Sequence, residues 1–184
     1  TKLTAYLISF REFLPKPEEE TEGIVCMIDA EKIIEEEAAK IDIPLHFLNN
    51  HDLGELNIKM DKSIFQVIVS EFFENANREY NKKINLSKTR ELEVYFEKDN
   101  LKSILIVSVL SKNLQFLDID NLHIFGQFPL ANTTSTGLGL YFLNKILEQA
   151  GAKRFEDGRF ISPKNLPQGS VIMMKLPVDI QKVN

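Results

Sequence analysis

The sequence predicts an α+β fold, a two-layer sandwich in which helices cover one face of a mixed, mostly antiparallel sheet. Short apolar or alternating runs typical of strands surround a helical pattern at residues 63–80. A second helical pattern at residues 140–150 is followed by two more strand-like runs. Because an amphipathic helix must bury its apolar stripe, we expect both helices to pack on the sheet that these strands form.

Composition and charge exclude several classes of protein. The 184 residues are 43% hydrophobic and 27% charged, which is typical of one globular domain with a substantial core. The net charge of −5 argues against a general nucleic-acid binder, and the single cysteine excludes an intrachain disulfide framework. No apolar run approaches the ~18 residues that span a membrane, and no signal peptide is visible. We expect a reducing, cytoplasmic location and no membrane contact by these residues.

The first residues of the chain form a unit of their own in this interpretation. Residues 1–14 carry apolar side chains at spacings of three and four, which predicts a helix that Pro15 and Pro17 end. We therefore divide the chain into an N-terminal helix and linker at 1–21 and a main domain at 22–184. Because the chain does not begin with Met, we expect a fragment in which this helix packs on the domain or ends a longer helix.

Ahead of the long helix, the pattern predicts three short strands and one helix. Asp29 caps the short helix, and Cys26 lies buried in the first strand. Either Asp61 or Ser63 caps the long helix, and Ser63 with Gln66 fits the capping-box spacing. In chain order the earlier elements are a strand at 24–28, a helix at 30–40, a strand at 43–47, a turn at 49–54 and a strand at 56–60.

After the long helix, the pattern predicts a hairpin of central strands, then a helix and a closing hairpin. Asp99 and Asn100 form the first hairpin turn, Gly151 stops the helix, and Pro163 and Pro167 lie in the last turn. In chain order the elements are a polar loop at 81–88, strands at 92–98 and 103–109, an irregular segment at 111–121, a short apolar stretch at 122–128, a polar loop at 129–135, a helix at 140–150 and strands at 158–161 and 170–176.

The long helix places three polar side chains in a row. Glu71 and Asn75 are four residues apart and Arg78 follows three later, so they share one side of the helix. On a half-buried helix these groups need partners, because unpaired buried polar groups are costly. A Mg²⁺ ion and a polyphosphate would supply them, since oxygen ligands suit Mg²⁺ and arginine suits phosphate. The alternative is a solvent-facing stripe of an ordinary helix.

A second polar stretch precedes the later helix. Gly137 and Gly139 follow a loop rich in Thr and Ser and sit just before that helix. Glycine lets backbone N–H groups approach a phosphate closely, and a helix N-terminus adds partial positive charge. The hydroxyls at 133–136 would add further donors. The alternative is a tight turn that glycine permits, with the hydroxyls capping the helix.

Together and in this order, the two stretches resemble the ATP-binding domain shared by sensor histidine kinases, gyrase-type ATPases, Hsp90 and MutL. Three segments look like its asparagine box, phenylalanine box and second glycine box, and they lie at 71–80, 124–128 and 136–140. The ending, with Gly169 and Leu176-Pro177, is similar to the final hairpin of histidine kinase domains. The resemblance covers residues 22–178, fits the kinase branch best and implies the Bergerat-type sandwich.

The resemblance implies a site for Mg²⁺-ATP. Asn75 would coordinate Mg²⁺, Glu71 would stand beside it as a catalytic residue, and Arg78 matches a basic position that contacts phosphate. The residues that would wrap the phosphates are Thr136, Gly137, Leu138 and Gly139. The resemblance also implies partners, namely a response regulator or upstream sensor domain, and a homodimer through the N-terminal helix. The chain can then be the cytoplasmic part of a membrane-anchored sensor.

The chain departs from the family at the first glycine box, Asp-x-Gly-x-Gly, whose Asp accepts a hydrogen bond from the adenine amino group. The equivalent residues here are Ser111, Asn113 and Gln115. Ser111 can still accept one hydrogen bond, although more weakly than a carboxylate, whereas the other two put side chains where the family keeps the backbone bare. None of the three histidines lies on the N-terminal helix, so a phospho-acceptor would lie elsewhere.

Three functions follow from these observations. The first is a histidine kinase ATP-binding module that transfers the γ-phosphate of ATP to a histidine outside this chain. The second is a pseudokinase-like regulatory or dimerisation module that keeps the fold but has lost nucleotide binding. The third is an ATP hydrolase with Glu71 as general base. Nucleotide binding separates the second function from the other two.

Overall fold

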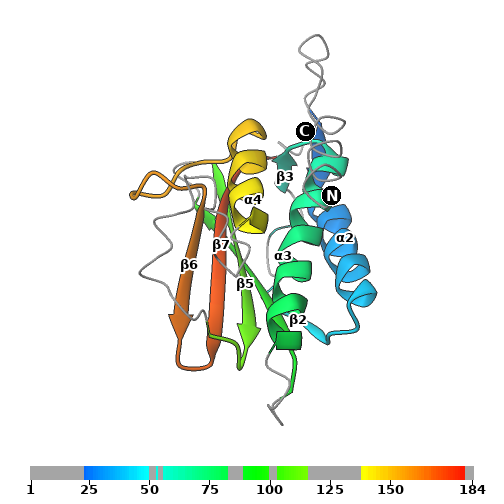
Figure 1. The fold of residues 1–184 in the computed structure, drawn as a ribbon. Coiled ribbons are helices and arrows are strands. Elements are labelled where there is room, and N and C mark those ends of the chain that lie inside the picture. Colours follow the sequence, from blue (N-terminus) through cyan, green and yellow to red (C-terminus); the bar gives the residue numbers. More distant parts are fainter. Residues whose placement is uncertain are drawn as a thin grey trace, which may run out of the picture.

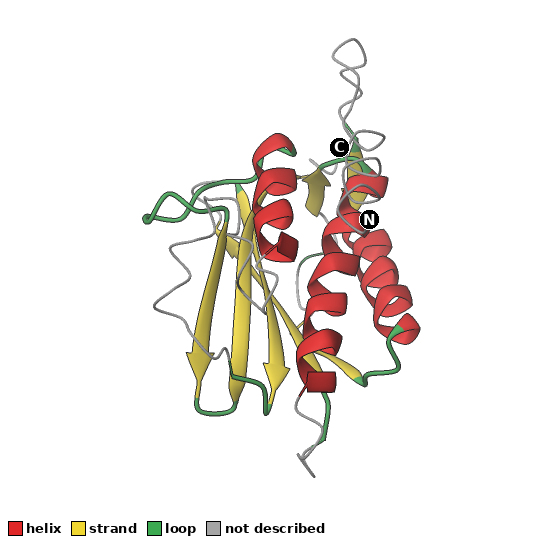
Figure 2. Ribbon diagram, viewed as in Figure 1, coloured by secondary structure: helices red, strands yellow, loops and turns green. Residues whose placement is uncertain are grey.

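Helices lie on one face of a twisted sheet in the computed structural model (Figures 1 and 2). The structure describes residues 23–49, 53, 56–82, 89–99, 103–115 and 138–180. Within them the helices are α2 (Met27–Lys40), α3 (Lys62–Lys82) and α4 (Leu138–Gln149), and the strands are β1 (Ile24–Cys26), β2 (Leu45–Asn49), β3 (Leu56–Lys59), β4 (Leu92–Asp99), β5 (Ile104–Lys112), β6 (Ile161–Leu166) and β7 (Gly169–Ile180). The predicted two-layer α+β sandwich is confirmed.

The sheet is mixed, as predicted, and β7 is its central strand, which pairs with β3, β5 and β6. The strand order is β1-β3-β7-β5-β4-β2, and β6 pairs with the first half of β7 on the side away from β5. All pairs are antiparallel except β2 with β4, which run parallel. The predicted central hairpin is confirmed as β4 and β5, which pair along their whole length.

The core lies between the sheet and the helices. Alternate residues of the central strands face the helices, as the period of two requires. These buried residues are Leu92, Val94 and Phe96 on β4, Leu105, Val107 and Val109 on β5, and Ile172, Met174 and Leu176 on β7. From the helices, Phe65 and Ile68 of α3 and Leu143 and Leu147 of α4 are fully buried against them. Each such side chain contributes ~1.5–3 kcal/mol by leaving water, so this layer holds the fold together.

The first elements differ in detail from the prediction. α2 begins at Met27, so Asp29 lies in its first turn instead of capping it, and Cys26 at the N-cap makes no side-chain cap bond. Asp29 still sits at the favourable positive end of the helix, and its carboxylate lies 3.6 Å from the Lys62 ammonium. Cys26, which was predicted to be buried, is only half-buried, because β1 is an edge strand of three residues.

The second strand begins two residues later than predicted. Asp42 adopts a left-handed conformation with φ of 53°, and Pro44 has no N–H for a ladder, so regular pairing starts at Leu45. The Pro44 carbonyl nevertheless accepts a hydrogen bond from the Leu92 amide at 2.9 Å. The helix and strand predicted around this segment, at 30–40 and 56–60, end within one residue of their observed positions.

Two further corrections concern β5 and the closing hairpin. Ser111, predicted to begin an irregular segment, belongs with Lys112 to β5 and pairs with β7. Gly158, predicted in a strand, lies in a turn with φ of 81°, and Pro163, predicted in the turn, lies in β6. A proline is tolerated there because β7 is the single pairing partner of β6 among the described strands, which leaves the other edge of β6 without a ladder.

Several predictions concern residues that the structure does not describe. They are the helix at 1–14, the apolar stretch at 122–128, the loop at 129–135 and parts of the turns at 49–54, 81–88 and 99–100. The division at residue 22 therefore stays a prediction. In the part of the chain that is described, no helix is both long and apolar enough to cross a membrane.

Candidate functional site

α3 is capped at its start by one of the two residues that the sequence offered. The Asp61 carboxylate accepts a hydrogen bond from the Ser63 amide at 2.7 Å, and its bond with the Ser63 hydroxyl holds the pKa of Asp61 below its usual value. The alternative capping box is not formed, because Gln66 donates instead to the buried Glu37 carboxylate of α2 at 2.8 Å. This contact ties α3 to α2 beside the sheet.

The other end of α3 is anchored on the ends of two strands. The Tyr80 hydroxyl donates to the Lys112 carbonyl of β5 at 2.6 Å and lies 3.0 Å from the Glu91 carbonyl that precedes β4. Burial of the ring raises the pKa of Tyr80 to about 12. The helix is therefore fixed at both ends, so the side chains between them are held at defined positions above the sheet.

The predicted polar row on α3 exists, and part of it is buried. The Arg78 guanidinium donates to the Asn75 carboxamide oxygen, with Nη1 and Oδ1 2.9 Å apart. The Glu71 Oε2 and Asn75 Nδ2 atoms are buried, and no group in the described part of the chain forms a hydrogen bond with either of them. Leaving a buried polar atom unpaired costs ~1–3 kcal/mol. A solvent-facing stripe would have no such atoms, so this alternative does not describe Glu71 and Asn75.

The electrostatic state of Glu71 reflects its burial. Desolvation raises the pKa of Glu71 above its usual value, and the nearby Glu74 carboxylate raises it further. The Arg78 guanidinium acts in the opposite direction. A cation bound at this carboxylate would add to the effect of Arg78 and favour the ionised form.

The row can satisfy both an ion and a phosphate. The unpaired Glu71 oxygen is a hard ligand of the kind that Mg²⁺ prefers, the unpaired Asn75 amide is a donor for a phosphate oxygen, and Arg78 adds a positive charge. The residues present therefore fit a Mg²⁺-polyphosphate, with the ion taking its remaining ligands from phosphate and water. If Asn75 coordinates the ion through Oδ1, Arg78 must release or share that oxygen. Over the described ranges, no three His, Cys, Asp or Glu side chains gather as a metal cluster.

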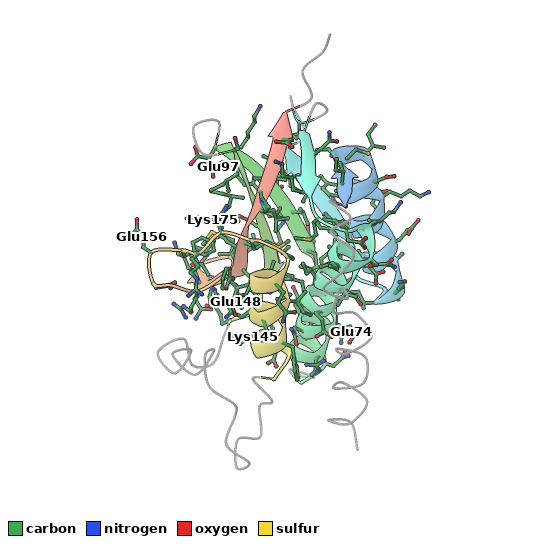
Figure 3. The ribbon with its side chains drawn as sticks, turned by 90° about the horizontal axis from the view of Figure 1, so that it is seen from above. Glu74, Glu97, Lys145, Glu148, Glu156 and Lys175 are labelled. Carbon is green, nitrogen blue, oxygen red and sulfur yellow. The ribbon has the colours of Figure 1, made fainter. Side chains whose placement is uncertain are left out.

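α4 packs beside α3 and runs in the opposite direction (Figure 1). The buried Leu143 and Leu147 hold it on the core, and the Asn144 carboxamide oxygen accepts a hydrogen bond from the Phe160 amide at 2.9 Å. Glu148 pairs with Lys145 of the same helix at 3.0 Å and with Arg154 just beyond it at 2.9 Å. Figure 3 shows Lys145 and Glu148 on α4 and Glu74 on α3, on the side of the molecule away from the sheet.

The glycine stretch is described only in part. α4 begins at Leu138, so Gly139 lies in its first turn instead of before it. Thr136 and Gly137 lie outside the described residues, as does the side chain of Leu138. The structure therefore brings the helix that carries this stretch beside the Glu71–Asn75 helix, while the phosphate-wrapping role of these residues stays a prediction.

The stretch in place of the first glycine box lies at the end of β5. Ser111 is buried on the helix-facing side, in line with Val107 and Val109. Asn113 adopts φ of 60°, a conformation that glycine and asparagine tolerate best, and its amide donates to the Thr89 carbonyl at 3.1 Å. Gln115 donates to the Leu166 carbonyl at 2.7 Å. Both replacement side chains are thus held by backbone carbonyls of neighbouring segments.

No family model and no curated protein matches the sequence. The structure does match solved structures of other proteins. The nucleotide-free catalytic domain of histidine kinase ThkA is 20% identical with a TM-score of 0.57, over 84% of this chain and 93% of that one. The mycobacterial sensor histidine kinase MprB is 15% identical with a TM-score of 0.61, over 88% and 100%. The Acinetobacter baumannii histidine kinase AdeS is 14% identical with a TM-score of 0.56, over 98% and 80%.

This chain has the histidine kinase catalytic-domain fold. The prediction from the sequence motifs is therefore confirmed at the level of fold, and identities of 20% or less carry no further. In this fold, the segment that resembles the asparagine box is in the second half of α3, the segment in place of the first glycine box ends β5, and residues 138–140 of the segment that resembles the second glycine box begin α4.

The sequence reasoning missed a buried polar residue next to Ser111 in the sheet. Ser170 of β7 is 2% exposed and is the register partner of Ser111. A signal was present, because Ser170 continues the alternation of the inward residues Ile172, Met174 and Leu176. The pairing itself had no local signal, since it joins residues from distant parts of the sequence.

Proposed function

We propose that this domain is the ATP-binding catalytic domain of a two-component sensor histidine kinase, which transfers the γ-phosphate of ATP to a histidine outside this chain. One observation carries the proposal: the buried Glu71 Oε2 and Asn75 Nδ2 atoms have no hydrogen-bond partner among the described residues, and they lie on the helix side that also bears Arg78. A ligand with both a cation and anionic oxygens would satisfy them, and the histidine kinase fold supports Mg²⁺-ATP as that ligand.

In this proposal each side chain has a separate role. Asn75 and Glu71 hold Mg²⁺, which when bound neutralises phosphate charge, and Arg78 contacts a phosphate oxygen. The residues that wrap the phosphates are Thr136, Gly137, Leu138 and Gly139, and Ser111 contacts the base. Catalysis then rests on positioning and charge neutralisation, as in phosphoryl transfer generally. The partners would be a second copy through the N-terminal helix, a response regulator and an upstream sensor domain, on the cytoplasmic side.

A second candidate is a pseudokinase-like module that regulates or dimerises without nucleotide. The observation that favours it is the side-chain content of the first glycine-box segment, where Ser111, Asn113 and Gln115 replace Asp, Gly and Gly. A third candidate, an ATP hydrolase, is favoured by the raised pKa of Glu71, since a general base works best with a pKa near the working pH.

Calorimetric titration of the purified domain with a non-hydrolysable ATP analogue, with and without Mg²⁺, tests the proposal. We expect Mg²⁺-dependent binding that Asn75→Ala abolishes. Asn77→Ala is the matched control, because this residue is on the same helix and its carboxamide oxygen accepts a hydrogen bond from Asn81 at an exposed position. No heat at millimolar nucleotide from a folded domain would contradict the kinase proposal and favour the regulatory module.

A further inference from the structure

Two buried serines face each other across the sheet where β5 ends and β7 begins. Ser111 and Ser170 are register partners, and they are 7% and 2% exposed. Both continue the helix-facing rows of their strands, whose next members, Val109 and Ile172, are apolar. The helix-facing side of the sheet is therefore apolar along β5 and β7 and ends in a pair of hydroxyls.

The surroundings of this serine pair are closely packed. The Tyr80 hydroxyl of α3 donates a hydrogen bond to the carbonyl of Lys112, the neighbour of Ser111, so the end of α3 lies over this part of the sheet. Gly169, the neighbour of Ser170, approaches the Ser111 carbonyl so closely that a Cβ there would lie 2.2 Å from its oxygen. The two strands are thus held in close contact, and the distance between the two hydroxyl-bearing residues is fixed.

The two side chains next in sequence are drawn away by other partners. The Asn113 amide donates to the Thr89 carbonyl, and the Gln115 amide donates to the carbonyls of Leu166 and Gly169. Their polar atoms are therefore committed to backbone groups. Ser111 and Ser170 are left as the polar groups that this part of β5 and β7 presents on the helix-facing side.

A pair of hydroxyl groups differs from a carboxylate in which bases it can select. An ionised carboxylate only accepts hydrogen bonds, so it selects a base with an amino group and rejects one with a carbonyl at the same position. A serine hydroxyl rotates and either donates or accepts. Two neighbouring hydroxyls can therefore meet an amino group or a carbonyl oxygen with equal ease.

We propose that Ser111 and Ser170 form a nucleobase site without selectivity between 6-amino and 6-oxo purines, so that the domain binds GTP about as well as ATP. This inference rests on the proposed function, in that the polar row on α3 holds the phosphates. It adds that the base contributes little to the choice of nucleotide and that Ser111 is the residue that sets this property.

The test is a pair of calorimetric titrations of the same domain with non-hydrolysable analogues of ATP and GTP, both with Mg²⁺. We expect dissociation constants within about fivefold of each other, because neutral hydroxyls favour neither base strongly. Ser111→Asp is expected to raise the preference for the ATP analogue about tenfold or more. Ser108→Asp is the matched control, because Ser108 is on the same strand but on the opposite face, between Tyr95 and Met173, and its ratio should not change.

Separate outcomes overturn separate claims. A tenfold or greater preference of the unmodified domain for the ATP analogue would overturn this inference and leave the proposed function intact. Binding of neither analogue would overturn both. Because a buried aspartate can prevent folding, the double variant Ser111→Ala with Ser170→Ala provides a second test. We expect it to weaken both analogues equally, and unchanged affinity in a folded double variant would also overturn the inference.

Discussion

Arg78 lies one turn after Asn75 on α3, and its guanidinium donates a hydrogen bond to the Asn75 carboxamide oxygen at 2.9 Å. The other end of the same carboxamide, Nδ2, is buried, and the residues that the structure describes give it no hydrogen-bond partner. By holding Oδ1, Arg78 also fixes the direction of Nδ2, the atom that would donate to a phosphate oxygen in the proposed site. The following predictions test this arrangement and the contacts that support it.

Replacing Arg78 should weaken nucleotide binding more than it weakens the fold. Arg78→Ala removes a charge that favours phosphate and frees the Asn75 carboxamide, so we expect affinity for a non-hydrolysable ATP analogue to fall about tenfold. Arg78→Lys keeps the charge but loses the planar donor geometry and should lie in between. Titration calorimetry measures affinity and thermal unfolding measures stability. Equal affinity in all three proteins would show that Arg78 does not contact the phosphates.

Neutralising Glu71 should stabilise the nucleotide-free domain near pH 7. Because burial raises the pKa of Glu71 in the folded state, the folded protein binds more protons than the unfolded one above the ordinary value of 4.5. Stability then falls as pH rises through that window. Glu71→Gln removes this fall, so its melting temperature should exceed that of the parent near pH 7 and approach it near pH 4.

Thermal unfolding between about pH 4 and pH 8 provides the measurement. The exposed Glu97→Gln is the control, since Glu97 lies on β4 facing away from the helices, and its curve should run parallel to that of the parent. A parallel curve for Glu71→Gln as well would show that the penalty does not come from this carboxyl group.

Removing the Tyr80 hydroxyl should loosen the end of α3. Tyr80→Phe loses the donor to the Lys112 carbonyl, and we expect the free energy of unfolding to fall by ~1–2 kcal/mol in urea denaturation. The raised pKa of about 12 adds a second signature, because the unfolded tyrosine ionises first and stability falls as pH rises above 10.0. This alkaline loss should be smaller in Tyr80→Phe. Tyr95→Phe, at an exposed position, should change neither quantity.

Asn113 should tolerate glycine better than alanine. Its φ of 60° is unfavourable for a residue with a Cβ, so Asn113→Ala should cost ~1–2 kcal/mol of stability. Asn113→Gly relieves the backbone but loses the bond to the Thr89 carbonyl, so it should be close to the parent. Urea denaturation of the three proteins tests this order. Because both variants lose the side-chain bond, a glycine variant that is less stable than the alanine variant would show that the left-handed backbone conformation at residue 113 does not decide the order.

The sequence by itself determined most of the elements and one side of the site. The 3.6-residue period of the apolar side chains, with the capping and stop residues, located α3 and α4 closely. The two-residue alternation of apolar and polar side chains located β4 and β5. The spacing of four placed Glu71 and Asn75 on one side of a helix, and three further residues placed Arg78 beside them. Each of these inferences depends on neighbours within a few residues, and the chain encodes such neighbours directly.

The tertiary structure decided what no local pattern contains. Whether the Glu71 and Asn75 atoms are buried depends on packing around α3, and the parallel pairing of β2 with β4 depends on where the chain returns after a long helix. Ser111 joined β5 because β7, far along the sequence, begins with a glycine that lets its backbone come close. The pairing of Ser111 with Ser170 follows from that register, because side chains meet across a sheet only when both strands are in place.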